Sequence, residues 1–267
     1  MMELITSAQN TRLKLVRRLE SRRGRMAEGA FAVEGEDLVA AGVAADWPLR
    51  FALCDADNMP PGDLLDQLLA GSCAQVQSNL FAAVSTMGHA PRIIGVFDLP
   101  DAVVFDRGAS QSSLPTLFLD GLRDPGNVGT VLRTASALGV HRVVIGPGTA
   151  DPFSPKATRA SMGAVFIVQI DEAATVDEVC AEGQPVVALD SEHGTPIWST
   201  ELGEAPVICI GSERTGVSEQ VAKIANIRIT IPQTGEIDSM NAGVAASIAL
   251  YELARRRALP ASYDKAT

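Results

Sequence analysis

The sequence predicts an α/β protein whose C-terminal half is built on a mainly parallel β-sheet. From residue 114 onwards, short runs of Val, Ile and Leu alternate with helical stretches, which is the pattern of βαβ units. Three of these runs are followed by polar loops, as expected where parallel strands end at a ligand site. The 267 residues, 46% hydrophobic and 4% aromatic, are enough for one large or two modest domains.

Residues 1–98 predict a separate, smaller α/β unit of normal domain size. Short apolar runs in it predict strands, and stretches with one apolar face predict helices. The basic segment 21–25 is interpreted as a turn or a mobile loop. The strands are expected at 31–35, 51–54, 74–77 and 92–97, and the helices at 9–20, 37–45, 63–70 and 79–85.

Residues 99–113 predict a linker, because Pro, Asp, Gly, Gln and Ser surround a single short apolar patch there. The second domain is therefore expected to span residues 114–267, with no repeat or low-complexity segment. Its strands are expected at 116–119, 142–145, 165–168, 186–189, 207–210 and 227–231, and its helices at 127–138, 155–162, 175–181, 217–224 and 242–257.

The net charge of −10 argues against a protein that holds nucleic acid through its overall field. The charge is unevenly distributed: residues 1–30 hold seven basic and three acidic groups, a balance of +4, which leaves −14 for the rest. This asymmetry indicates an anionic partner at the N-terminal end, although a solvated helix face would explain it as well. The basic groups are Arg12, Lys14, Arg17, Arg18, Arg22, Arg23 and Arg25.

The four cysteines are scattered and form no Cys-x-x-Cys pair, and only three histidines accompany them. Neither a metal site nor a disulfide framework is predicted, and buried thiols are the expected alternative. The N-terminus lacks the apolar core of a signal peptide, and no apolar run approaches the ~20 residues needed to span a bilayer. The cytoplasm is the expected location.

The first polar loop, 120–126, precedes a predicted helix. Asp124, Pro125 and Gly126 form a turn, Asn127 is a suitable N-cap for the helix, and Arg133 lies six residues into it. By itself, Asn127 is explained as a helix cap, and Arg133 is explained as a cation at the protein surface.

The second loop is Gly211-Ser-Glu-Arg-Thr-Gly216, which follows the strand at 207–210. Its two glycines allow a backbone to approach a ligand closely, but the Gly-Lys-Ser/Thr ending of a phosphate-binding loop is missing. The dinucleotide fingerprint and the Gly-x-Ser-x-Gly elbow are also missing from the chain.

The third loop begins where Pro232 ends the strand at 227–231, because proline has no N–H to give to a ladder. It presents Ser239 and Asn241 at the start of a helix rich in small residues, which lets another backbone come close. By itself, Ser239 is explained as a helix cap.

Together the three loops resemble the SpoU (TrmH) family of RNA ribose 2′-O-methyltransferases, within the SPOUT superfamily. The order and the separations of the motifs fit over about 155 residues. The N-terminal half is similar, more loosely, to the family's ribosomal-protein-like substrate-binding domain through Ile5-Thr-Ser-x-Gln-Asn, the basic helix and Phe31-x-Val-Glu-Gly35. The matching motifs are Asn127-Val-Gly-x-x-x-Arg133-x-Ala135, Ile210-Gly-Ser-Glu-x-x-Gly216 and Ile231-Pro-Gln-x-Gly-x-x-x-Ser239-Met-Asn241.

The resemblance implies that the end of the second sheet is threaded into a deep trefoil knot, an exception to the rule that chains do not knot. It implies S-adenosylmethionine as cofactor, bound in a bent shape, and no metal. The adenine and ribose would meet backbone groups near Leu189, Gly211, Ile231 and Met240. It also implies a homodimer that packs the helix of the first motif and the final helix against the partner, although a tight contact within one chain would equally explain the small residues.

The resemblance gives Arg133 the central catalytic role, with Asn127, Glu213, Ser239 and Asn241 shaping the pocket and orienting Arg133 or the ribose. Because a guanidinium keeps its proton to above pH ~12, phosphate clamping and alkoxide stabilisation are the more conservative role for Arg133 than that of a literal base. The sequence departs from the family at Gln233, where Met is frequent, and at Met240, where Leu is frequent. Met for Leu conserves volume.

The resemblance predicts an RNA 2′-O-ribose methyltransferase acting on ribosomal RNA, with transfer RNA as the second choice. The RNA would be held by the basic groups of the first domain. Two alternatives remain open: a catalytically inactive RNA-binding assembly factor of the same fold, and an unrelated nucleotide-binding α/β protein. The residues expected to contact RNA are Arg12, Arg17, Arg18, Arg22, Arg23 and Arg25.

Overall fold

The computed structural model describes residues 2–68, 72–87, 91–100, 114–173, 175–180, 184–190, 193–234 and 240–257. The chain divides into two compact units: Met1–Asp101 with Asp151–Ile167, and Ala102–Ala150 with Val168–Thr267. The segment 151–167 thus packs with the first unit, whereas the sequence placed it in the second domain. The predicted linker lies almost entirely outside the described residues.

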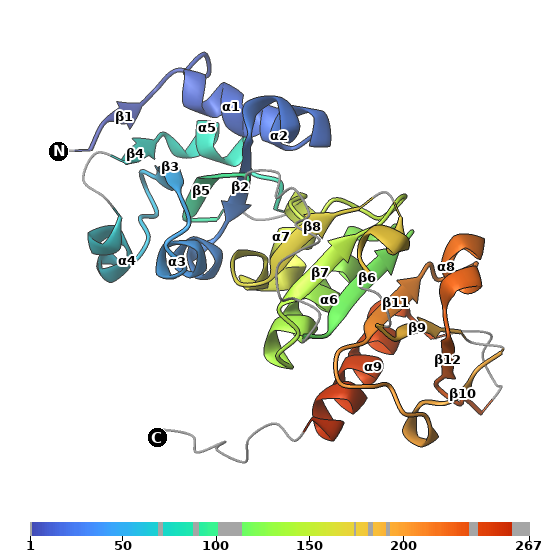
Figure 1. Cartoon of the computed structure of the whole chain (residues 1–267). Helices are drawn as coiled ribbons and strands as arrows, with labels where there is room; N and C mark the ends of the chain where they lie inside the picture. Colours follow the sequence, from blue (N-terminus) through green and yellow to red (C-terminus); the bar gives the residue numbers. More distant parts are fainter. Residues whose placement is uncertain are drawn as a thin grey trace, which may run out of the picture. The chain divides into compact units, whose positions relative to one another are not determined.

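The first unit contains a five-stranded mixed sheet with the strand order β1-β4-β3-β5-β2 (Figure 1). Strands β1, β4 and β3 run parallel to one another, whereas β5 is antiparallel to both β3 and β2. The short β1 was not predicted, because two residues carry no recognisable alternation. The strands are β1 (Leu4–Ile5), β2 (Ala30–Glu34), β3 (Leu49–Asp55), β4 (Cys73–Val76) and β5 (Ile93–Asp98).

Helix α1 begins after Asn10, whose side chain accepts a hydrogen bond from the N–H of Arg12, and it buries one apolar face. The segment 21–25 was expected to be a turn, and this prediction is wrong. Ser21 caps a helix there by accepting from Gly24 N, and Gly29 ends it in the left-handed conformation. The helices of this unit are α1 (Thr11–Leu19), α2 (Arg22–Glu28), α3 (Glu36–Ala44), α4 (Gly62–Gln67), α5 (Ser78–Ala82) and α7 (Pro155–Ser161).

An aromatic cluster explains why 165–168 is not the strand that the sequence predicted. Phe166 lies in a 3-10 helix, Ala164–Phe166, and its ring packs against those of Phe31, Trp47 and Phe97 at centroid distances of 5.0–5.7 Å. A short apolar run cannot by itself distinguish a strand from another buried segment. The strand β8 (Gln169–Glu172) follows the run and belongs to the second unit.

The second unit contains a seven-stranded sheet with the order β10-β12-β9-β11-β6-β7-β8, in which every pairing is parallel. The predicted α/β class with a mainly parallel sheet is therefore confirmed. The remaining strands are β6 (Thr116–Asp120), β7 (Arg142–Ile145), β9 (Val186–Leu189), β10 (Thr195–Pro196), β11 (Val207–Gly211) and β12 (Ile227–Thr230).

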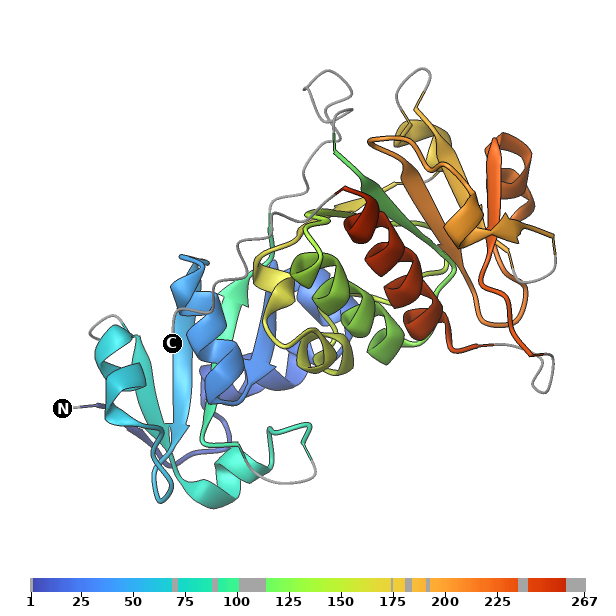
Figure 2. The same cartoon turned by 90° about the horizontal axis from the view of Figure 1, so that it is seen from below.

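Helices cover the second sheet, and two of them lie side by side. Helices α6 (Pro125–Ala137) and α9 (Ala242–Arg256) pack against each other, and the hydroxyl groups of Thr134 and Ser247 are 3.0 Å apart (Figure 2). Val221 of α8 (Glu219–Ile224) belongs to a separate core cluster with residues of β6, β7, β9 and β11. Where a helix was expected at 175–181, the described part is the 3-10 helix Val176–Glu178.

The parallel arrangement places the carboxyl ends of β9, β11 and β12 at the same edge of the sheet, because these strands are neighbours in the order β12-β9-β11. The three chain segments that follow them are thereby brought together. Among the described residues, no helix is long and apolar enough to cross a membrane.

Candidate functional site

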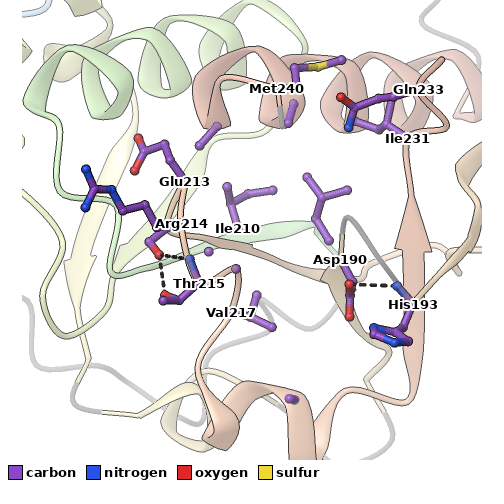
Figure 3. Close-up of a pocket in the computed structure, with 17 residues that line it drawn as sticks. Asp190, His193, Ile210, Glu213, Arg214, Thr215, Val217, Ile231, Gln233 and Met240 are labelled. Carbon is purple, nitrogen blue, oxygen red and sulfur yellow. Dashed lines mark hydrogen bonds between the residues drawn. The ribbon is translucent and has the colours of Figure 1, made fainter. Parts of the chain in front are cut away.

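A cavity of about 600 Å³ lies at this edge of the second sheet (Figure 3). Its walls come from the ends of β9 and β11, from the residues that follow β12, and from the first turns of α9. The volume is within the range of small-molecule sites, about 300–1,000 Å³.

The four residues predicted to surround the cofactor all line this cavity. Leu189 ends β9, Gly211 ends β11, Ile231 follows β12, and Met240 precedes α9. Residues more than fifty positions apart in the sequence thus line the same cavity. The side chain of Gln233, the unexplained departure from the family pattern, also faces the cavity (Figure 3).

The second loop is a closed turn, which explains both of its glycines. Ser212 and Gly216 form a β-bridge with N···O distances of 2.9 and 3.1 Å. A Cβ atom on Gly211 would lie 2.0 Å from the carbonyl carbon of Gly216, so that only glycine fits there, and Gly216 has a φ of +63°. The loop therefore folds tightly back onto the end of β11.

The opposite end of the cavity carries polar groups that the sequence motifs did not single out. The Asp190 carboxylate accepts a hydrogen bond from the backbone N–H of His193 at 3.0 Å and pairs with Arg228 at 3.6 Å. Asp190 and His193 both line the cavity (Figure 3). An acidic residue directly after a parallel strand was the available signal for Asp190.

Three of the predicted catalytic residues form one hydrogen-bonded chain. The amide of Asn127 donates to Glu213 Oε1 at 2.5 Å, and its oxygen accepts from Asn241 Nδ2 at 3.0 Å. Each residue comes from a different sequence motif. Gly243 leaves room for the chain, because a Cβ there would be 3.2–3.3 Å from the amide oxygens of Asn241 and Asn127.

The cap of α6 differs from the expected one. Asp124 rather than Asn127 is the N-cap: its carboxylate accepts from the backbone N–H groups of Gly126 and Asn127 at 2.6 and 3.1 Å. The Asn127 side chain is thus available for Glu213. Asn241 does cap α9, accepting from Val244 N at 3.1 Å while its amide donates to Asn127.

Two predicted residues are not part of this hydrogen-bonded chain. Ser239 lies outside the described residues. Arg133 is exposed on α6 and does not line the cavity. Its guanidinium has no hydrogen bond or ion pair within the part of the chain that the structure describes. A permanently charged group of this kind is free to meet an anion from outside the chain.

Arg25 was expected to bind RNA, and the structure contradicts this. Its side chain is 4% exposed and donates to Asp151 Oδ2 at 2.5 and 3.0 Å and to the carbonyl oxygens of Leu19 and Glu20 at 2.7 and 2.9 Å. The guanidinium therefore stabilises the first unit from inside. Counting the charges in the sequence could not reveal that Arg25 is buried, because its partner Asp151 lies 126 residues away.

The other basic residues of the first unit lie at its surface, some of them in ion pairs. Arg12 pairs with Glu3 at 3.4 Å, and Arg18 pairs with Glu28 at 2.7 Å. Such exposed pairs contribute little to stability. Among the basic groups of residues 1–30, the other exposed side chains are those of Lys14, Arg17, Arg22 and Arg23.

Two family models match the chain. The SpoU rRNA Methylase family model matches residues 115–251, just over half of the chain. A model of the MRM3-like substrate binding domain matches residues 10–95.

Similar proteins match over nearly the whole length. The 23S rRNA (guanosine(2553)-2′-O)-methyltransferase RlmP of Bacillus subtilis is 29% identical over 94% of this chain and 99% of its own. The crystal structure of the SpoU methyltransferase AviRb from Streptomyces viridochromogenes, in complex with AdoMet, has a TM-score of 0.83 at 25% identity, covering 93% of this chain and 98% of its own. The AdoMet-bound rRNA methyltransferase from Sinorhizobium meliloti has a TM-score of 0.84 at 28% identity, with 97% and 99% covered. With the cavity and the three joined motifs, these matches show that the chain belongs to the SpoU rRNA methylase family.

Proposed function

We propose that this protein transfers the methyl group of S-adenosylmethionine to a ribose 2′-hydroxyl of ribosomal RNA. The observation that carries the proposal is the hydrogen-bonded chain Glu213–Asn127–Asn241, which joins the three motif loops beside the cavity of about 600 Å³. An unrelated nucleotide-binding protein would have no reason to join these three side chains.

The cavity fits S-adenosylmethionine in size and in chemistry. Apolar side chains of Leu189, Ile210 and Ile231 offer a surface for a flat base, and Gly211 lines the cavity with backbone groups that can pair with its edge. Leu189, Gly211, Ile231 and Met240 would hold the cofactor. The bound cofactor supplies a methyl group activated by a sulfonium leaving group.

The polar rim extends this assignment to a residue that the motifs missed. Asp190 carries a carboxylate that accepts from the His193 backbone N–H and lies at the end of a parallel strand. Carboxylates in this position bind ribose hydroxyls in other α/β folds. We assign Asp190 to the sugar of the cofactor.

Arg133 would stabilise the negative charge that develops on the oxygen of the target hydroxyl. A ribose hydroxyl is a poor acid, and a guanidinium beside it stabilises the alkoxide and clamps the neighbouring phosphate without giving up its own proton. Asn127, Glu213, Asn241 and Ser239 would fix the geometry around it. The exposure of Arg133 supports this role, because RNA must reach it from solvent.

A homodimer is part of the proposal. The outer face of α9 exposes Val244 and Tyr251, which are 48% and 60% accessible and lie on the same side, seven residues apart. Helix α6, which carries Arg133, lies beside α9. A second copy packed on these helices would cover the apolar side chains and set Arg133 at the boundary between subunits.

The first unit would hold the RNA. Its exposed basic side chains (Arg12, Arg17, Arg18, Arg22 and Arg23) can contact phosphates, and the match to a substrate-binding family model supports the assignment. We divide the chain into a substrate-binding domain at 1–98 and a methyltransferase domain at 114–267, of which the segment 151–167 packs with the first unit. The end of the methyltransferase domain would form the trefoil knot. Ribosomal RNA as substrate implies a cytoplasmic location.

Two measurements test the function. Calorimetry with S-adenosylmethionine is expected to show saturable binding, and no binding would refute the enzyme assignment. Mass spectrometry of RNA from a strain lacking the protein is expected to show the loss of one methylated ribose in ribosomal RNA. Loss in transfer RNA would correct the substrate, and binding of cofactor with no lost methyl group would leave an inactive assembly factor.

A further inference from the structure

Two thiols face each other across neighbouring strands of the first sheet, far in sequence from the methyltransferase motifs. Cys54 lies in β3 and Cys73 in β4, and their sulfur atoms are 2.9 Å apart. Both are free cysteines in the structure. The pair could not be predicted from the sequence, because eighteen residues separate the two positions.

The strand register makes the two cysteines diagonal neighbours, because Cys54 lies opposite Gln75 and Cys73 lies opposite Ala52. Leu53 of β3 is paired with Ala74 of β4, and both side chains belong to the hydrophobic cluster on one face of the sheet. Side chains alternate along a strand, so Cys54 and Cys73 project from the opposite face. A disulfide has an S–S distance of about 2.05 Å, so the sulfur atoms must approach by about 0.9 Å. Diagonal positions have Cα atoms about 7–8 Å apart, so the two strands must also shift locally to close the bond.

The two thiols differ in exposure and in acidity. Cys54 is fully buried, whereas Cys73 is partly exposed. The hydrogen bond from Cys54 lowers the pKa of Cys73, and the Arg12 guanidinium contributes in the same direction. The same hydrogen bond, together with burial, raises the pKa of Cys54. A partly exposed thiol of lowered pKa beside a buried thiol is the arrangement of a redox-active dithiol.

The other two cysteines lack this arrangement and serve as internal controls. Burial raises the pKa of Cys180 to about 11 and raises that of Cys209 as well. Both belong to, or pack against, an apolar cluster of the second unit. Thiols of this kind are inert structural groups.

We propose that Cys73 and Cys54 form a peroxide-reactive dithiol that is converted reversibly to a disulfide. The Cys73 thiolate attacks one oxygen of a hydroperoxide, an S–O bond forms, the O–O bond breaks, and the leaving oxygen takes up a proton. The Cys54 thiol then loses its proton and attacks the Cys73 sulfur, and hydroxide leaves as water. In total, the two thiols lose two electrons and two protons, and the hydroperoxide is reduced to an alcohol, or to water, plus one water.

The first test uses the unmodified protein. The reduced chain is treated with limited iodoacetamide at pH 7.5 and mapped by peptide mass spectrometry, and Cys73 is expected to react at least roughly tenfold faster than Cys180. After treatment with hydrogen peroxide, a disulfide-linked peptide containing Cys54 and Cys73 is expected, which dithiothreitol removes. Equal reactivity of Cys73 and Cys180, or a protein that keeps all four thiols after peroxide, would overturn the proposal.

Variants separate the two roles. In Cys54→Ser, peroxide is expected to leave Cys73 as a sulfenic acid that a dimedone probe captures in a one-to-one adduct. In Cys73→Ser, neither the disulfide nor the adduct is expected, and Cys180→Ser is expected to behave like the wild type. A dimedone adduct on Cys54 in the Cys73→Ser protein would reverse the assigned roles and refute the proposal. Circular dichroism establishes that each variant is folded.

Discussion

Helix α2 of the first unit and helix α6 of the second unit place an arginine in opposite environments. In α2, Arg25 is buried against Asp151 and two backbone carbonyl groups. In the second unit, Arg133 projects from α6 with no partner among the described residues. The difference teaches that a positive charge in the sequence can become either an internal structural group or an exposed group available to a ligand, depending on the acceptors that the fold places around it.

The largest expected effect tests the buried side of this comparison. Arg25→Ala removes a guanidinium that makes four hydrogen bonds, so that Asp151 Oδ2 and two carbonyl groups lose this donor. The free energy of unfolding of the first unit is expected to fall by about 3–5 kcal/mol. Urea denaturation measures the loss. Arg23→Ala, three residues from the Arg25 partner Glu20 and exposed, is the control and is expected to change stability by less than about 0.5 kcal/mol.

The exposed side is tested by Arg133→Ala. We expect kcat to fall by about 10²–10³, because one charge-stabilising donor is lost at the reacting hydroxyl. The Kd for S-adenosylmethionine should remain nearly unchanged, since Arg133 does not line the cavity. Single-turnover methyl transfer and calorimetry measure the two quantities, and Arg133→Lys tests whether charge alone suffices. A variant that kept most of its rate would remove Arg133 from the central role.

The polar chain of the second unit is tested by Asn127→Asp. This change places a carboxylate where the Asn127 amide donates to Glu213 at 2.5 Å, so that the pKa of one carboxyl group should rise. The destabilisation, about 1–2 kcal/mol, should be complete near pH 8, above the raised pKa, and should disappear near pH 4. Urea unfolding against pH measures it. Asn127→Ala adds no charge, and a deficit with the same pH dependence in both variants would argue against the Asn127–Glu213 contact.

The surface arginines of the first unit are tested together in Arg17→Ala/Arg23→Ala. Each lost phosphate contact should flatten the plot of log affinity against log salt by about 0.7–0.9, so the pair should reduce the slope by about 1.4–1.8. Filter binding of ribosomal RNA fragments at several salt concentrations measures this. If the slope stays the same, the RNA surface lies elsewhere. Stability should not change, in contrast to Arg25→Ala.

The smallest expected effect concerns Glu252 of the second unit, which pairs with two arginines. Glu252 accepts hydrogen bonds from Arg255 and Arg256, which lower the pKa of its carboxyl group to about 2. Its stabilising contribution is present above pH ~4.5 and is lost as the pH falls towards 2. Glu252→Gln should lower the free energy of unfolding by about 1 kcal/mol at pH 7, since partial exposure screens the pairs, and by less at pH 3. An equal loss at both pH values would exclude the ionised carboxylate as the cause.

The sequence predicted the parallel sheet of the second unit because its strands are apolar runs separated by clear turns. The resemblance to the SpoU family pointed to four residues that line the cavity, Leu189, Gly211, Ile231 and Met240, but not to Asp190 and His193. The sequence could not predict the helix at 22–28, because this segment has few apolar residues, although Ser21 caps the helix in the structure. Nor could it predict that Phe166 joins Phe31 and Trp47, because that packing depends on contacts across more than a hundred residues.

The strand order of the second sheet has a consequence for how the protein is made. Strand β11 pairs with β6, although about ninety residues separate them, and β12 pairs with β9. Pairings between distant segments close large loops and slow folding relative to helical proteins. The cavity also needs Met240 and the first turn of α9. On the ribosome, the cofactor site is therefore completed only after residue 245 has left the exit tunnel, so S-adenosylmethionine can stabilise the finished fold but cannot guide the early steps.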